Sequence, residues 1–175
     1  MIAVRILGHS GAGKTTLIER LLPALAEQGR VASIKSIHHP VEIDTEGKDT
    51  HRHRTAGAER VVGITPALTA AFETRGKDDY GSEAAALEAL LGDLRDRGFE
   101  YVVVEGFSAA SSLPAIVVGG RDGDGGDEGG AGDEGDGSDA SDGRTVVASV
   151  DDADGVDVGA LVERIDALDP WTGAA

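Results

Sequence analysis

Apolar residues alternate along the chain between short continuous runs and longer stretches with helical spacing. The short runs predict β-strands, and the stretches with apolar residues every three or four positions predict amphipathic helices. Strands are expected at 2–7, 31–37, 61–65, 67–73, 100–104, 114–118 and 145–150, and helices at 15–28, 49–58, 82–97 and 158–168. Strands that alternate with helices favour an α/β fold, with a mostly parallel sheet flanked by helices.

Residues at the ends of two of these helices predict where they begin and stop. Ser82 is suited to cap the helix at 82–97, and Gly98 follows the end of that helix. For the short helix, the side chain of either Asp49 or Thr50 can serve as the cap. The sequence therefore predicts a side-chain cap at the start of both helices.

A complete phosphate-binding loop, Gly-His-Ser-Gly-Ala-Gly-Lys-Thr-Thr, directly follows the first strand. Gly8, Gly11 and Gly13 let the backbone turn tightly and present its N–H groups to phosphate oxygens. Lys14 can reach the β- and γ-phosphates, and the hydroxyl of Thr15 can coordinate Mg²⁺. The nucleotide-binding residues expected from this Walker A pattern are Gly8, Ser10, Gly11, Ala12, Gly13, Lys14, Thr15 and Thr16. The pattern predicts a P-loop NTPase-like fold.

A carboxylate at the end of the strand at 100–104 is the second candidate for site chemistry. Glu105 follows Val-Val-Val, and Gly106 after it allows a close turn. In a protein with a phosphate loop, such a strand can deliver its carboxylate beside Thr15 and the metal ion. Thr15 and Glu105 are therefore the expected Mg²⁺ ligands, although Glu105 can also be a polar residue that simply ends a strand.

A polar segment beyond the strand at 31–37 holds the third set of candidates. Asp49 can order a magnesium-bound water or position the attacking water, and His38 and His39 can contact phosphate or a partner. Arg52 or Arg54, supplied by a second subunit, can add positive charge at the reacting phosphate. We expect Lys14, Asp49 and Glu105 to be the catalytic residues. Four of the five histidines fall within 16 residues, which leaves a transition-metal site open beside an ordinary solvated helix.

The composition of the chain limits the classes of protein to which it can belong. At 175 residues the chain suits a single domain spanning 1–175, and the absence of cysteine excludes disulfides and thiolate metal sites. The 32 acidic against 16 basic residues give a net charge of −16, which favours a halophilic source and disfavours nucleic-acid binding. No stretch is long and apolar enough to suggest membrane association, so a cytoplasmic location is expected.

The segment 119–144 differs in kind from the rest of the chain. It holds nine acidic residues, two arginines and eleven glycines. Such a composition cannot bury enough apolar surface to offset its ordering entropy, and so predicts a disordered insertion between two strands. Calcium binding by its Asp-Gly pairs is the alternative, but the spacing lacks the regular periods of known calcium motifs.

Taken in order, these motifs resemble one family. The phosphate loop, Ile34-Lys35 with His38-His39, Gly47-Lys48-Asp49, Arg54 with Ala56-Gly57-Ala58, and Val104-Glu105-Gly106-Phe107 are similar to those of MobB, the molybdopterin-guanine dinucleotide biosynthesis adapter proteins. The resemblance covers roughly 2–118. It implies GTP binding, weak GTPase activity, a homodimer, and association with molybdopterin and the guanylyltransferase that attaches GMP to it.

Two features separate this chain from the family pattern, and two other functions stay open. Ser108 stands where the family commonly has lysine, and the acidic insertion is foreign to it. One alternative is an ATP-dependent small-molecule kinase or ligase similar to dethiobiotin synthetase, and the other is a metallochaperone GTPase. The chain has no Asn-Lys-x-Asp segment, so GTP as the ligand rests on the resemblance alone.

Overall fold

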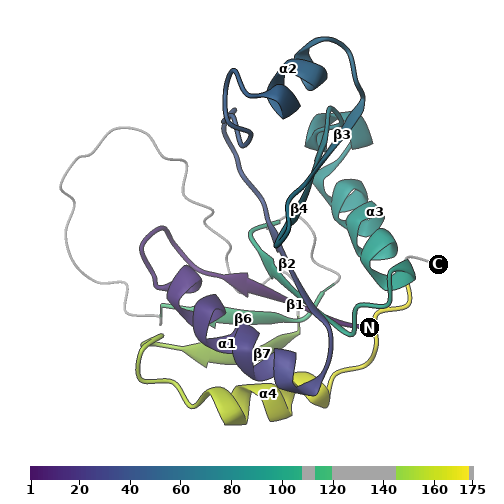
Figure 1. Cartoon of the computed structure of the whole chain (residues 1–175). Coiled ribbons are helices and arrows are strands. Elements are labelled where there is room, and N and C mark those ends of the chain that lie inside the picture. The colour runs from purple at the N-terminus through teal and green to yellow at the C-terminus, as the bar shows by residue number, and fades with distance from the viewer. Residues whose placement is uncertain (108–112, 120–144, 174–175) are drawn as a thin grey trace, which may run out of the picture. The chain divides into compact units, whose positions relative to one another are not determined.

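The structure is a computed structural model of the chain, and it describes residues 1–107, 113–119 and 145–173 (Figure 1). Contacts divide the chain into two compact units, which are described separately: residues 1–36 with 87–175, and residues 37–86. The main elements of the first unit are β1 (Ile2–Leu7), α1 (Lys14–Gln28), β2 (Val31–Lys35), β5 (Tyr101–Glu105), β6 (Ala115–Val118), β7 (Val146–Val150) and α4 (Val158–Asp166). α3 (Glu83–Asp96) begins in residues of the second unit and ends in residues of the first.

The first unit is built on a five-stranded parallel sheet with the order β2-β5-β1-β6-β7. This arrangement confirms the expected α/β fold with a mostly parallel sheet. β1 lies at the centre, between β5 and β6, and the phosphate loop leaves its carboxyl end. Because parallel strands end at the same edge of a sheet, the residues that follow β2, β5, β6 and β7 meet at the edge that carries this loop.

The main core lies between this sheet and the two helices α1 and α4, which lie side by side (Figure 1). Alternate residues of β1, Val4 and Ile6, belong to the same buried cluster as residues of both helices, such as Leu17 and Leu161. Each fully buried side chain of this kind contributes about 1.5–3 kcal/mol. This packing fixes the start of α1 against the end of β1.

Arg5 is the exception in the apolar run of β1, and it is fully buried. Its two terminal nitrogens donate hydrogen bonds to the backbone oxygens of Phe107 and Leu113, each at 3.1 Å. These oxygens lie at the two described ends of the connection between β5 and β6. The buried guanidinium therefore holds that connection against the central strand.

The second unit contains a short helix and a separate antiparallel hairpin. α2 (Asp49–Thr55) is followed by β3 (Arg60–Ile64) and β4 (Thr69–Glu73), which pair only with each other in the part of the chain that the structure describes. A 3₁₀ turn, η1 (Lys77–Tyr80), was not expected from the sequence. None of the helices formed by described residues is long and apolar enough to cross a membrane.

One predicted cap is confirmed and the other is wrong. The hydroxyl of Ser82 accepts the backbone N–H of Ala85 at 3.1 Å, as expected for a cap of α3. α2 instead begins after Lys48 with no side-chain cap, so Asp49 and Thr50 are already its first two residues. The hydroxyl of Thr50 donates to Oδ1 of Asp44 at 2.9 Å. Apart from Gly119, the expected insertion at 119–144 lies outside the described residues, as does Ser108.

Candidate nucleotide-binding site

The backbone of the loop between β1 and α1 adopts the positive φ angles that its glycines predict. Gly8, Gly11 and Gly13 have φ values of 149°, 77° and 91°, which side-chain-bearing residues rarely adopt. A Cβ atom on Gly8 would also overlap the backbone oxygen of Val118 at the end of β6. α1 begins after Gly13 with no side-chain cap and no acidic residue in its first turn. The amides at this helix end are therefore not taken up by a side-chain acceptor, which suits a phosphate.

Lys14 folds back across this loop. Its ammonium donates to the backbone oxygens of Gly8 at 2.7 Å and of His9 at 2.8 Å. Thr15 is exposed beside it, and Thr16 is half-buried. A lysine ammonium, a threonine hydroxyl and the first amides of α1 are thus brought together, which is the donor set that a triphosphate needs.

Glu105 ends β5, directly beside β1, and it has a partner that the sequence did not reveal. Its Oε1 atom lies 2.9 Å from the ammonium of Lys35, which ends the neighbouring strand β2 in the same register. The side chain of Glu105 is 13% exposed and that of Lys35 is 56% exposed. In the sequence, the sign of this ion pair is that Lys35 and Glu105 each stand at the end of a strand. That position predicts their contact only when it is known that the two strands are neighbours.

The turn after Glu105 brings the ends of β2 and β5 close together. Gly106 has φ 84°, and a Cβ atom on it would lie 2.9 Å from Cβ of Ser36. Phe107, which follows, is buried and also has a positive φ of 57°. The glycine predicted for a close turn is therefore required by its positive φ and by the close approach of the Ser36 side chain.

The segment that follows β7 lies against the phosphate loop. Ala153 is buried, and its Cβ would lie 3.0 Å from a Cβ atom placed on Gly13. The guanidinium of Arg20, on α1, donates to the backbone oxygens of Ala153 and of Val156, the latter at 3.0 Å. This contact could not be predicted from the sequence, because it joins residues more than 130 positions apart.

The residues at this site fit Mg²⁺ better than a transition metal. The hydroxyl of Thr15 and the carboxylate of Glu105 are hard oxygen donors, and Mg²⁺ commonly takes one or two protein oxygens together with water and phosphate oxygens. No group of three or more His, Asp or Glu side chains gathers to hold a metal among the described residues. The histidine-rich segment therefore shows no metal-ligand cluster there.

The remaining predicted residues lie in the second unit. His38 and His39 are exposed. The side chain of Asp49 is 89% exposed on α2, 3.7 Å from Arg52. Arg54 donates to Glu42 at 2.6 Å, and this hydrogen bond holds the pKa of Glu42 below its ordinary value. The roles expected for these residues stay predictions.

Asp44, rather than Asp49, is the buried carboxylate of this segment. Its Oδ1 atom accepts from the backbone of Thr45 and the hydroxyl of Thr50, at 2.8 and 2.9 Å. Its Oδ2 atom is buried and has no hydrogen-bond partner among the described residues. The pattern of the sequence did not distinguish the buried aspartate from the exposed one.

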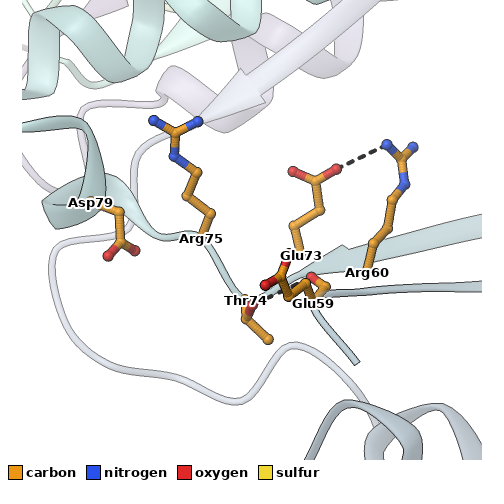
Figure 2. A pocket seen from close by; sticks show the side chains of 6 residues that line it. All are labelled: Glu59, Arg60, Glu73, Thr74, Arg75 and Asp79. Atoms are coloured by element: carbon orange, nitrogen blue, oxygen red, sulfur yellow. Dashed lines mark hydrogen bonds and ion pairs between the residues drawn. The ribbon is translucent and has the colours of Figure 1, made fainter. Parts of the chain in front are cut away.

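A charged pocket of about 520 Å³ also lies in the second unit (Figure 2). It is lined by Glu59, Arg60, Glu73, Thr74, Arg75 and Asp79. Figure 2 shows Arg60 and Glu73 pointing toward one another, and they form an ion pair of 3.1 Å. The guanidinium of Arg75 lies 3.8 Å from the ring centroid of Tyr80. None of the residues expected at the nucleotide site lines this pocket.

Comparisons with known proteins agree with the resemblance seen in the motifs. A putative molybdopterin-guanine dinucleotide biosynthesis adapter protein of Methanocaldococcus jannaschii is 35% identical over 121 residues, which cover 67% of this chain and 47% of that protein. The adapter protein of Escherichia coli is 35% identical over 117 residues, 66% of this chain and 63% of its own length. The chain thus spans about half to three-fifths of the length of these relatives.

Similarity to a solved structure shows the fold of this chain. The crystal structure of Bacillus subtilis MobB matches 94% of this chain and 98% of that chain, with a TM-score of 0.61 and 23% identity. The family model described as Molybdopterin guanine dinucleotide synthesis protein B matches residues 3–124, which is more than half of the chain. With the phosphate loop and the Glu-Gly turn at one edge of the parallel sheet, the chain belongs to the MobB family.

Proposed function

We propose that this protein binds a nucleoside triphosphate, GTP, with Mg²⁺ and serves as an adapter in the synthesis of molybdopterin guanine dinucleotide. The observation that carries the proposal is the loop between β1 and α1, where three glycines adopt positive φ and the ammonium of Lys14 lies across the turn. The guanine base is taken from the names of the relatives, since no base-reading segment stands in the sequence.

Each residue of the site has one role in this proposal. The loop amides and Lys14 hold the β- and γ-phosphates, and Thr15 and Glu105 hold the metal ion, which neutralises phosphate charge when bound. In the structure Lys35 balances the charge of Glu105, so metal binding must compete with that ion pair. Asp49 is proposed to order a water. Hydrolysis is expected to be slow, because the phosphate loop itself supplies no arginine to the reacting phosphate. Arg52 or Arg54 of a second subunit would have to supply that charge.

The partners follow from the family and not from the site geometry. The adapter name of the relatives suggests that this chain, too, works beside the enzyme that attaches GMP to molybdopterin. A binding protein with slow turnover suits delivery of a nucleotide better than rapid catalysis.

The ligand is tested by competition of GTP, ATP and molybdopterin for the purified protein in molar KCl. We expect GTP to bind with Mg²⁺ and to be displaced poorly by ATP. Binding of ATP without binding of GTP would overturn the proposal. A burst of ADP that depends on an added small acid would instead place the protein with the kinases and ligases.

Glu105→Gln is expected to weaken the effect of Mg²⁺ on triphosphate binding about tenfold. The substitution removes one charged metal ligand, while the phosphate contacts of Lys14 and the loop are unchanged. The measurement is the ratio of affinities with and without Mg²⁺, by isothermal titration calorimetry. Glu100→Gln, just before β5, serves as the matched control and should keep the wild-type ratio. An unchanged ratio in Glu105→Gln would remove Glu105 from the metal site.

A further inference from the structure

The loop that joins β7 to α4, residues 151–157, is fixed to the start of α1. Cβ of Ala153, in this β7–α4 loop, would lie 3.0 Å from a Cβ atom placed on Gly13 of the phosphate loop. The guanidinium of Arg20, on α1, donates to the backbone oxygens of both Ala153 and Val156. The middle of the β7–α4 loop is therefore held close to the phosphate loop at two points.

The strand order indicates which way a nucleotide bound in the proposed manner would point. The metal ion bridges the β- and γ-phosphates, and its proposed ligand Glu105 ends β5, on one side of β1. The α-phosphate and the nucleoside then extend toward the other side of β1, where β6 and β7 end. The β7–α4 loop leaves the sheet at this edge, so it lies on the side of the base and not on the side of the γ-phosphate.

The β7–α4 loop carries four aspartates, and two of them already have a structural role. Asp152 accepts the backbone N–H of Asp154 at 2.9 Å, and Asp157 caps α4. Asp151 and Asp154 are exposed, and neither carboxylate accepts a hydrogen bond from the described residues. Of these two, only Asp154 lies between the residues that Arg20 anchors, so its position beside α1 is the better fixed.

The chemistry of the bases determines what a carboxylate at this place would select. Guanine presents the donors N1–H and N2–H₂ side by side, whereas adenine has the acceptor N1 and a C–H group there. An ionised carboxylate can only accept, so it takes both guanine donors in two parallel hydrogen bonds and repels the adenine edge. An Asn-Lys-x-Asp segment cannot read the base in this protein, because the chain contains no asparagine.

We propose that Asp154 selects guanine over adenine, by accepting hydrogen bonds from N1–H and N2–H₂ of the base. The inference rests on the proposed function, because it deepens the same nucleotide site. Arg20 is a positioning residue in this account: it does not touch the base, and its two hydrogen bonds keep Asp154 at the start of α1.

Asp154→Asn is expected to move the preference of the site from guanine toward xanthine. The amide of asparagine has one acceptor and one donor, which match N1–H and O2 of xanthine. GTP should bind about tenfold more weakly and XTP about tenfold more tightly, so the ratio of the two affinities should change about a hundredfold. Both affinities are measured by isothermal titration calorimetry with Mg²⁺ in molar KCl.

Asp151→Asn is the matched control, because Asp151 is exposed in the same loop but lies outside the residues that Arg20 anchors. This variant should keep the wild-type ratio of GTP to XTP affinity. An unchanged ratio in Asp154→Asn, or an equal change in Asp151→Asn, would overturn the inference.

ITP separates failure of this inference from failure of the proposed function. It keeps the triphosphate and N1–H but lacks the N2 amine, so the wild-type protein should bind it about tenfold more weakly than GTP. Asp154→Asn should bind the two about equally. Wild-type protein that binds no triphosphate would overturn the proposed function and this role with it. Wild-type protein that prefers GTP, with the same preference in Asp154→Asn, would overturn the role of Asp154 alone.

Arg20→Met tests the positioning role. The variant should still bind triphosphate, because Lys14 and the phosphate loop are unchanged, but its preference for GTP over ITP should fall by about half or more on a logarithmic scale. Arg164→Met removes one hydrogen bond to the backbone of Val147, away from the β7–α4 loop, and should keep the full preference. Thermal unfolding shows whether both variants are folded. A full preference for GTP in folded Arg20→Met would contradict the positioning role.

Discussion

Lys14→Ala is expected to lower the affinity for the triphosphate by about ten- to a hundredfold and to leave the fold intact. The ammonium lies across the phosphate loop and is the only lysine there. A charge-assisted hydrogen bond to phosphate contributes about 1.5–3 kcal/mol, and each 1.4 kcal/mol is a factor of ten in affinity. Titration of a fluorescent GTP analogue measures the affinity, and circular dichroism measures the fold.

The fold should survive because the two contacts of Lys14 are replaceable. Its partners are the backbone oxygens of Gly8 and His9, in a loop that water reaches. Losing such bonds costs about 1 kcal/mol. Lys77→Ala, at a lysine that lies 3.6 Å from Glu83, is the control and should bind normally. Affinity that is unchanged in Lys14→Ala would show that the loop does not hold the nucleotide.

The elements that the sequence predicted well are those that depend on near neighbours. The apolar run of β1, the glycines that follow it and the helical spacing of α1 are all read within about 30 residues. The strand at 100–104 and its carboxylate were likewise visible, because an apolar run followed by Glu-Gly needs no knowledge of its neighbours. These local signals place Lys14, Thr15 and Glu105 at one edge of a parallel sheet.

The features that the sequence missed depend on contacts between distant segments. Lys35 pairs with Glu105 only because β2 lies beside β5, and nothing in either strand states that order. The cap expected at Asp49 or Thr50 was wrong because α2 begins one residue earlier than a cap at either position allows, directly after Lys48. The two short strands were predicted, but not that they form a hairpin separate from the main sheet.

Arg5→Met is expected to lower the free energy of unfolding by about 2–6 kcal/mol, because two buried backbone oxygens each lose a donor at a cost of about 1–3 kcal/mol. Replacing a buried ion pair with apolar residues can be harmless when both charged groups are removed. Here the acceptors are the backbone oxygens of Phe107 and Leu113, which no substitution of Arg5 removes. Methionine fills much of the same space but leaves both oxygens without this donor. Denaturant unfolding at fixed KCl concentration measures the loss.

A series at this position separates the hydrogen bonds from the packing of the side chain. Lys at position 5 keeps the charge but lacks the planar fork that reaches two carbonyls at once, so Arg5→Lys should retain about half of the stability that Arg5→Met loses. Arg95→Met, at a half-exposed arginine on α3, should change stability by less than about 1 kcal/mol. Equal losses for Met and Lys would assign the effect to packing. No loss for Met would mean that water or another donor replaces the guanidinium, and that the β5–β6 connection does not depend on it.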